Sequence, residues 1–235
     1  MGEEKLRELV ANYQPNDRVL ASMADIKILA AVGPTASGKT TLMATLAENN
    51  HNYKVVLDET SRKPRPGEKQ GVDFLFRSRE EIIDDAKAGN LVQIALGPND
   101  DLYCTRLENY PHNGTGLIAL VPAAVKEFRK LPVASFEAAF IVPRTYELWQ
   151  SWLTKQARDS HWSDEQLNKR LQEAKQSFEF ALADRHIKFV LNDDTQRSVK
   201  RLMQVAKGTS PDDESLATSE ASKHYHKLHN AIDIK

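Results

Sequence analysis

The chain has 235 residues, of which 40% are hydrophobic, and 32 basic against 33 acidic side chains leave a formal net charge of -1. This composition suits one α/β domain with short appendages, and the balanced charge argues against nucleic acid or a membrane as a partner. The single cysteine, Cys104, excludes an intramolecular disulfide and a cysteine-rich zinc site. No apolar run approaches the roughly 20 residues of a membrane helix, so we expect a cytoplasmic protein.

The elements follow one another in a regular alternation. Residues 1–25 carry two helical stretches and are expected to form an N-terminal helical extension. From residue 26, apolar runs of strand length alternate with helical patterns; the predicted strands are 27–32, 53–59, 116–121, 135–143 and 186–192. Such alternation predicts an α/β domain with a parallel core sheet flanked by helices over residues 26–208.

Capping signals locate further helices. Ser78 followed by Glu81 forms a capping box, and Gly89 closes the short helix after it, so residues 60–112 are expected to form a mixed α/β insert. A second capping box, Ser163 with Gln166, opens a helix with one apolar stripe. The members of that stripe are Leu167, Leu171, Ala174, Phe178 and Ala181.

The last part of the chain changes in character. Asp194 is expected to cap a helix that Gly208 ends. From about residue 209 the sequence is polar and poor in aliphatic side chains, which predicts a disordered tail over 209–235. Three histidines in this tail, His224, His226 and His229, are expected to be solvated rather than to bind a metal.

The sequence GPTASGKT, residues 33–40, fits the phosphate-loop pattern G-x-x-x-x-G-K-[ST]. It follows an apolar strand and precedes a helix, which is the context that phosphate binding requires. The glycines let backbone amides point inward, Lys39 would reach the terminal phosphates, and Thr40 would ligate Mg²⁺. The residues expected to bind ATP are Gly33, Pro34, Thr35, Ala36, Ser37, Gly38, Lys39, Thr40 and Thr41.

A second basic element follows the next strand. Arg62 and Arg65 stand three residues apart, with prolines at positions 64 and 66 that stiffen the backbone. Arginine forks recognise phosphates bidentately, so the pair could hold a phosphate monoester. Charge alone would equally fit a solvated basic loop.

This segment resembles the guanylate kinase signature T-T-R-x-P-R-x-G-E-x-x-G-x-D-Y-x-F. The matching residues are Thr60, Arg62, Pro64, Arg65, Gly67, Glu68, Gly71, Asp73 and Phe76. The likeness extends to Tyr103 and Thr105, to the helix around residues 167–171, and to residues 191–194. It implies a P-loop nucleoside monophosphate kinase fold, with a nucleotide-binding insert near 60–112 and a helical lid near 155–172.

The resemblance also implies roles for individual residues. It implies Lys39, Arg170 and Arg158 as catalytic cations and Asn192 beside the ATP base. The residues implied for the nucleoside monophosphate are Arg62, Arg65, Glu68, Phe74, Gln93, Tyr103 and Thr105. Mg²⁺ is the implied cofactor, ATP the co-substrate, and GMP or dGMP the expected acceptor.

The sequence departs from the family pattern at several of these positions. Gln93 stands where a glutamate would face guanine, and Phe74 where a tyrosine would contact phosphate. The strand near residues 116–121 ends with Leu120 and Pro122 instead of carboxylates. Asp58 and Glu59, at the end of the preceding predicted strand, are both candidates to bind magnesium or accept a proton.

Three hypotheses follow for the function. The first is transfer of the ATP γ-phosphoryl group to a nucleoside monophosphate, converting GMP to GDP. The second is a catalytically weakened binding module, and the third a kinase of another phosphorylated small molecule. The phosphate loop also resembles that of tRNA dimethylallyltransferases, but the segment after Asp58 does not.

Trp149 and Trp152, at i and i+3 on one helix, could stack on a base, although core or lid packing is the default expectation.

Overall fold

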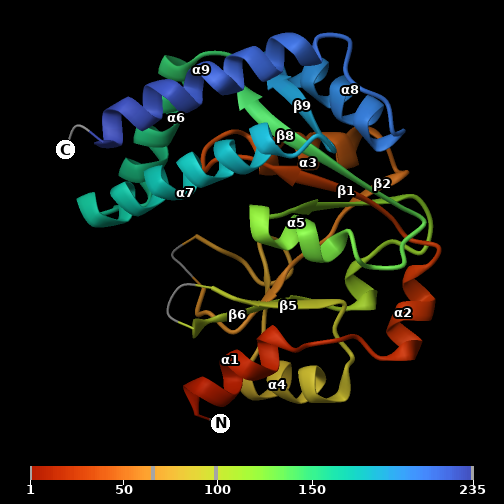
Figure 1. Cartoon of the computed structure of the whole chain (residues 1–235). Helices are drawn as coiled ribbons and strands as arrows, with labels where there is room; N and C mark the ends of the chain where they lie inside the picture. The colour runs from red at the N-terminus through yellow and green to blue at the C-terminus, as the bar shows by residue number, and fades with distance from the viewer. Residues whose placement is uncertain (1, 65–66, 98–99, 234–235) are drawn as a thin grey trace. The chain divides into compact units, whose positions relative to one another are not determined.

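The computed structural model describes residues 2–64, 67–97 and 100–233. The chain divides into two compact units (Figure 1). The insert unit comprises Met1–Lys27, Asn52–Gly116 and Glu127–Ser135, and the phosphate-loop unit comprises Ile28–His51, Leu117–Lys126 and Phe136–Lys235. Within the described ranges, no helix is both long and apolar enough to cross a membrane.

A five-stranded sheet carries the phosphate loop, with strand order β2-β7-β1-β8-β9. Its strands are β2 (Tyr53–Val55), β7 (Thr115–Ala119), β1 (Lys27–Val32), β8 (Ser135–Pro143) and β9 (Ile187–Asn192). Strands β8 and β9 pair in parallel, with Ala138 opposite Ile187. The central strands read as unbroken apolar runs because both of their faces are buried, as in parallel sheets covered by helices. The predicted parallel core sheet is confirmed.

Helices flank the sheet of the phosphate-loop unit (Figure 1). They are α3 (Lys39–Asn49), α5 (Pro122–Phe128), α6 (Tyr146–Asp159), α7 (Asp164–Ala183) and α8 (Thr195–Ala206). Ser163 and Gln166 form the predicted capping box of α7, and the side chain of Asp194 caps α8. The buried part of the α7 stripe consists of Ala174, Phe178 and Ala181, which confirms the inner face of this helix.

The expectation of a disordered tail is wrong. Helix α9 (Glu214–Asp233) occupies most of residues 209–235 and packs on α7, β9 and α6 (Figure 1). Its buried stripe consists of Ala217, Ala221, His224 and Leu228. His224 lies among the rings of Tyr146, Trp149 and Phe178 and is not solvated. The spacing is helical, but small and imidazole side chains supply it, so the usual aliphatic signal is missing.

The insert unit has its own mixed sheet, with strand order β4-β3-β6-β5. Its strands are β3 (Glu59–Thr60), β4 (Leu75–Phe76), β5 (Gln93–Leu96) and β6 (Leu102–Thr105); its helices are α1 (Glu3–Ala11), α2 (Asp17–Met23), α4 (Arg79–Ala88) and the 3-10 turn η2 (Leu107–Asn109). Ser78 and Glu81 form the predicted capping box of α4, and Gly89 ends that helix at a φ of 73°. Leu6, Ile82 and Cys104 belong to the core of this unit.

The predicted strand over residues 53–59 is divided in the structure. Residues 53–55 form β2 of the five-stranded sheet, whereas Glu59 and Thr60 form β3 of the mixed sheet. Apolar periodicity cannot reveal such a change of sheet, because both halves are extended and partly buried. The carboxylates at 58 and 59 consequently belong to the insert and do not end a core strand.

Candidate nucleotide site

The phosphate loop joins β1 to α3 with a backbone that glycine permits. Gly33 and Gly38 have φ values of 145° and 93°, and a Cβ at Gly33 would lie 2.9 Å from the carbonyl oxygen of Ile141. A Cβ at Gly38 would collide with the side chain of Asn192. Ala36 also has a left-handed φ of 63°, which is unusual for a residue with a side chain. The loop is therefore held in a strained form, as is common where backbone amides must point at a ligand.

Lys39 folds back over this loop. Its ammonium group donates hydrogen bonds to the carbonyl oxygens of Gly33 and Pro34, each at 2.8 Å. Burial and, to a smaller extent, the charge of Arg170 lower the pKa of Lys39 to about 8. No carboxylate is among its partners in the described part of the chain. A triphosphate would supply the missing negative charge and favour the charged form of the lysine.

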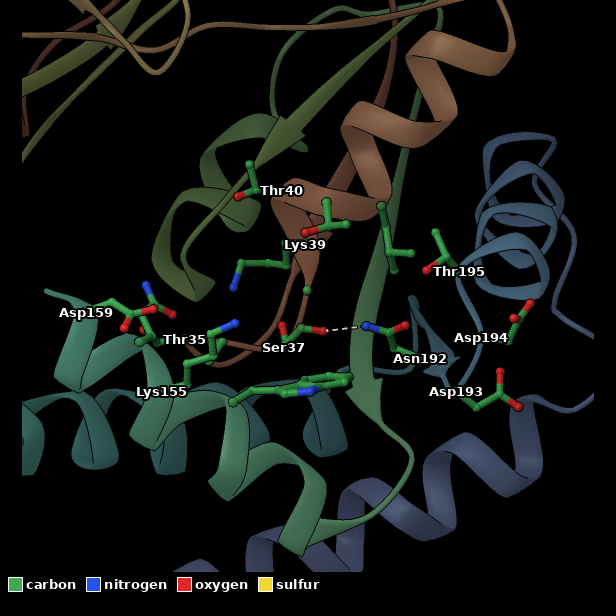
Figure 2. A pocket seen from close by; sticks show the side chains of 16 residues that line it. Thr35, Ser37, Lys39, Thr40, Lys155, Asp159, Asn192, Asp193, Asp194 and Thr195 are labelled. Atoms are coloured by element: carbon green, nitrogen blue, oxygen red, sulfur yellow. Dashed lines mark hydrogen bonds between the residues drawn. The ribbon is translucent and has the colours of Figure 1, made fainter. Parts of the chain in front are cut away.

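Two side chains from other elements donate hydrogen bonds to backbone carbonyl oxygens of the loop. The amide of Asn192 donates to the carbonyl oxygen of Ser37 at 2.9 Å, the dashed line in Figure 2. The indole N–H of the fully buried Trp149 donates to the carbonyl oxygen of Thr35 at 2.8 Å. Both contacts join the loop to elements far away in the sequence, β9 and α6, so the conformation of the loop depends on the packing of the whole unit.

A cavity of about 840 Å³ opens in front of the loop. Its walls are the loop and the start of α3, the exposed side of α6, and the segment that joins β9 to α8. Figure 2 shows Lys155 and Asp159 on one side of the loop and Asp193, Asp194 and Thr195 on the other. The volume lies within the range of small-molecule sites. Of the residues predicted to bind ATP, Thr35 to Thr41 and Asn192 line the cavity, whereas Gly33 and Pro34 form the base of the loop and bond to Lys39.

The hydroxyl groups of Ser37 and Thr40 lie in the loop and at the start of α3. Ser37 Oγ is buried and makes no hydrogen bond within the described part of the chain. Thr40 is exposed at the start of α3 and lines the cavity. Mg²⁺ commonly takes one or two protein oxygens and completes its shell with phosphate and water oxygens, so the Thr40 hydroxyl fits such an ion. Among the described residues, no cluster of three acidic, histidine or cysteine side chains could hold a metal alone.

The two predicted lid arginines differ in position. Arg170, on α7, bonds to Glu173 at 2.8 Å, lies over the ring of Trp162, and is close enough to Lys39 for its charge to lower that pKa. Arg158 lies in the exposed last turn of α6 and is absent from the lining of the cavity. Neither arginine lines the cavity, but the charge of Arg170 acts on Lys39, whereas no such effect is seen for Arg158 among the described residues.

In the insert unit, Arg62 is the centre of a polar and aromatic cluster. Its guanidinium group forms a bidentate ion pair with Glu68, at 2.8 and 2.9 Å, and its Nε donates to the Tyr103 hydroxyl at 3.2 Å. The same group lies 5.1 Å from the centre of the Phe74 ring. Four of the residues predicted to bind the acceptor thus lie together. Arg65 lies outside the described residues.

Gln93 and Thr105 lie opposite each other on strands β5 and β6. Thr105 is fully buried, and its hydroxyl shares a hydrogen bond of 2.9 Å with the hydroxyl of Tyr110. Gln93 is partly exposed at the start of β5. These two predicted base contacts are adjacent in the sheet, although only the side chain of Gln93 is open to solvent.

Asp58 and Glu59, adjacent in sequence, have opposite environments. Glu59 is fully buried and bonds to Arg77 at 2.8 Å and Arg106 at 2.9 Å, so it is a structural ion pair. The side chain of Asp58 is partly buried and forms no hydrogen bond or ion pair with any described residue, and burial raises its pKa to about 7. The proposal of Glu59 as a magnesium ligand is therefore wrong, because its oxygens are already bonded to arginines.

Several residues of the cavity wall are not among those predicted to bind ATP, although the sequence suggests base stacking for Trp152 and a helix cap for Asp194. On α6 these are Trp152, Lys155, Gln156 and Asp159, and after β9 they are Asp193, Asp194 and Thr195. The α6 set has the i, i+3, i+4 and i+7 spacing of one helix face, counted from Trp152. That spacing was the available signal, but it does not tell a core face from a cavity wall.

The formed phosphate loop at the amino end of α3, on a parallel sheet with a mixed insert, defines a P-loop protein of the nucleoside monophosphate kinase class. The guanylate kinase family model matches residues 25–208. A guanylate kinase of Hahella chejuensis is 30% identical over 175 residues, covering 73% of this chain and 81% of that protein. One of Wolbachia pipientis is 28% identical over 185 residues, covering 76% and 88% respectively. The chain belongs to the guanylate kinase family.

A solved structure agrees on the fold. The crystal structure of a guanylate kinase from Anaplasma phagocytophilum matches with a TM-score of 0.54 at 20% sequence identity. The match covers 79% of this chain and 86% of the other. At this identity the likeness concerns the fold alone.

Proposed function

We propose that this protein is an ATP-dependent guanylate kinase that transfers the γ-phosphoryl group of ATP to GMP, with Mg²⁺ as cofactor. The observation that carries the proposal is the formed phosphate loop, in which Lys39 bonds, as far as the described residues go, only to backbone carbonyl oxygens. Such a loop is a receptor for anions, and family membership gives the class of reaction. A cytoplasmic location is part of the proposal, since the buried thiol of Cys104 suits a reducing compartment.

On the ATP side, backbone amides from Gly33 to Thr41 would surround the α- and β-phosphates, and Lys39 would reach the β- and γ-phosphates. The Thr40 hydroxyl would hold Mg²⁺, which would supply positive charge to offset that of the phosphates. Arg170 would contact the transferring phosphoryl group, since its charge already acts on Lys39. Arg158 would join only if α6 and α7 rearrange as a lid over residues 155–172, because its side chain points to solvent in this form.

On the acceptor side, the insert at about residues 60–112 would bind the monophosphate. Arg62 would hold its phosphate oxygens together with the Tyr103 hydroxyl, and Arg65 would add a second fork. The ion pair with Glu68 orients the Arg62 guanidinium group, which also lies over the ring of Phe74. Gln93 and Thr105 would contact the base; an amide can both donate to and accept from the edge of guanine.

Asp58 would accept the proton or orient the acceptor. A carboxyl group with a pKa near 7, whose side chain bonds to no described residue, is suited to proton exchange at neutral pH. Catalysis of phosphoryl transfer rests mainly on positioning and charge neutralisation, so its contribution would be smaller than that of Lys39.

The principal test is an acceptor screen. ADP release from ATP would be followed with GMP, dGMP, AMP, CMP and UMP in turn, and we expect GMP and dGMP to be used at the highest rates. Absence of turnover with all five would reject the enzymatic proposal. A further panel of phosphorylated sugars would test the third hypothesis, because two arginines recognise a phosphate whatever molecule carries it.

One observation favours a second candidate function, a binding module with weakened catalysis. Strand β7 is followed by Leu120, which is buried, and Pro122, which opens α5, so no carboxylate stands at this end of the strand. Charges at such a site do much of the catalytic work. Calorimetry separates the candidates: a module would ignore ATP·Mg or GMP, whereas the enzyme binds both.

A further inference from the structure

Trp152 is the one large aromatic side chain in the wall of the phosphate-loop cavity, as far as the described residues show. It lies on α6, one turn after Trp149, whose burial and hydrogen bond to Thr35 attach this helix to the loop. One helical turn places side chains at i and i+3 on the same side of a helix. Trp149 therefore fixes the position from which Trp152 reaches the cavity.

The surroundings of Trp152 differ from those of Trp149. Trp149 contacts the rings of Tyr146 and Phe178 and donates its indole hydrogen. Trp152 is only partly buried and forms no ring contact, cation–π contact or hydrogen bond with any residue in the described part of the chain. A ring that packed merely to complete a core would have neighbours of its own, as Trp149 has.

The chemistry of the cavity determines what this ring can hold. The loop amides and Lys39 would bind the phosphates of a nucleoside triphosphate, and an uncharged indole ring cannot pair with the charge of those phosphates. The base is the planar, apolar part of such a ligand, and its faces stack on indole. On the opposite wall the carboxylates of Asp193 and Asp194 are already bonded, Asp193 to Arg201 and Asp194 to the backbone of α8. Their carboxylates are therefore poor candidates to read the base edge.

We propose that Trp152 binds the base of the nucleoside triphosphate by stacking, and so supplies the affinity of this site for a nucleotide over a bare polyphosphate. The proposal rests on the function proposed above, because it assumes that a triphosphate occupies the loop. Trp152 is then a specificity-determining residue of the ATP site, although it takes no part in phosphoryl transfer.

The test compares two ligands in four proteins. Calorimetry would measure the affinities of ATP·Mg and of inorganic tripolyphosphate with magnesium for the wild type and for Trp152→Ala, Trp152→Leu and Trp152→Phe. A base–aromatic stack contributes about a tenfold to a hundredfold in affinity. We expect the Ala and Leu variants to lose ATP affinity by that factor, the Phe variant to stay within a few-fold, and tripolyphosphate to bind all four equally.

The outcomes separate the two proposals. If Trp152→Leu binds ATP like the wild type, the side chain is only an apolar cover and the stacking proposal is overturned, while the function stands. If tripolyphosphate affinity falls as much as ATP affinity in the variants, Trp152 shapes the loop instead of the base site, which also overturns it. If the wild type binds neither ligand, the function and the inference fail together.

Fluorescence gives an independent readout. The chain has three tryptophans, and a base stacked on Trp152 should quench its emission. We expect ATP, but not tripolyphosphate, to quench the wild type, and the quenching to disappear in Trp152→Phe even though that variant still binds ATP. Trp162→Phe is the matched control and should keep the quenching; if the signal vanished there instead, the ring that senses the base would not be Trp152.

Discussion

The two units hold their principal cations in different ways. In the phosphate-loop unit, Lys39 is bonded to two carbonyl oxygens and to no carboxylate of a described residue, and burial lowers its pKa to about 8. In the insert unit, Arg62 is already in a bidentate ion pair with Glu68 and packs on Phe74. The charge of Lys39 is therefore not balanced by a described carboxylate, whereas that of Arg62 is already balanced by Glu68 before a ligand binds. Binding should therefore stabilise the loop by new charge pairing, while the acceptor must share Arg62 with Glu68.

The largest effect is expected from removing the unpaired cation. Lys39→Ala should lower kcat by about 10³-fold, the scale of losing a central group that stabilises charge in the transition state. ADP release would measure turnover, and calorimetry would show ATP affinity reduced with GMP affinity unchanged. Lys200→Ala, an exposed lysine on α8, is the matched control and should behave like the wild type. Wild-type turnover in Lys39→Ala would show that the loop does not carry the reaction.

The phosphate-loop unit also depends on the helix beyond residue 208. Leu228 is 1% exposed on α9, so Leu228→Ala should lower the free energy of unfolding by about 2–5 kcal/mol through the cavity that it leaves. Leu216, on the same helix but 49% exposed, is the control, and Leu216→Ala should change stability by less than about 0.5 kcal/mol. Urea unfolding would measure both. Equal, small effects would mean that α9 does not pack on this unit in solution.

Substitution of Arg62 tests the role of the insert unit in binding the acceptor. Arg62→Ala should raise KM for GMP by about 100-fold, since a pair of hydrogen bonds to a charged phosphate is lost, while KM for ATP stays the same. Arg62→Lys should recover little of this, because an ammonium group cannot form the planar fork. Lys63→Ala, at the exposed neighbouring position, is the control. A rise in KM for ATP in Arg62→Ala would contradict the division of roles between the units.

Local chemistry made much of this structure predictable. The phosphate loop and the capping boxes at Ser78 and Ser163 were located from sequence because a few neighbouring residues determine them. Helix α9 escaped prediction because its buried stripe consists of alanines, a histidine and a single leucine, and because its stability comes from packing on α7 and β9.

Tertiary context decided the rest of the site. Trp149 and Trp152 are the same residue type one turn apart, yet one is core and the other lines a cavity. Asp58 and Glu59 are adjacent carboxylates, yet Arg77 and Arg106 form ion pairs with Glu59 and, within the described residues, not with Asp58. No pattern in the sequence separates such pairs, because the difference lies in which other elements pack beside them.

The smallest effect sharpens the contrast between those two carboxylates. Because burial raises the pKa of Asp58 to about 7, the folded protein favours its protonated form. Protonation of Asp58 therefore contributes to the stability of the fold. This contribution is complete below about pH 4, the ordinary pKa of aspartate, and is lost as the pH rises through 7. Asp58→Asn is neutral throughout, so its melting temperature relative to the wild type should rise between pH 4 and 7 and level off above.

Since Asp58 is only partly buried, water screens its charge, and we expect a net difference of about 1 kcal/mol, or roughly 2–4 °C, across this interval. Thermal melting of both proteins from pH 4 to 8 would measure it. Glu59→Gln serves as the contrasting variant: it breaks an ion pair with two arginines and should destabilise the protein at every pH in this range. A difference for Asp58→Asn that does not change with pH would mean that Asp58 titrates at its ordinary value and is not suited to proton exchange at neutral pH.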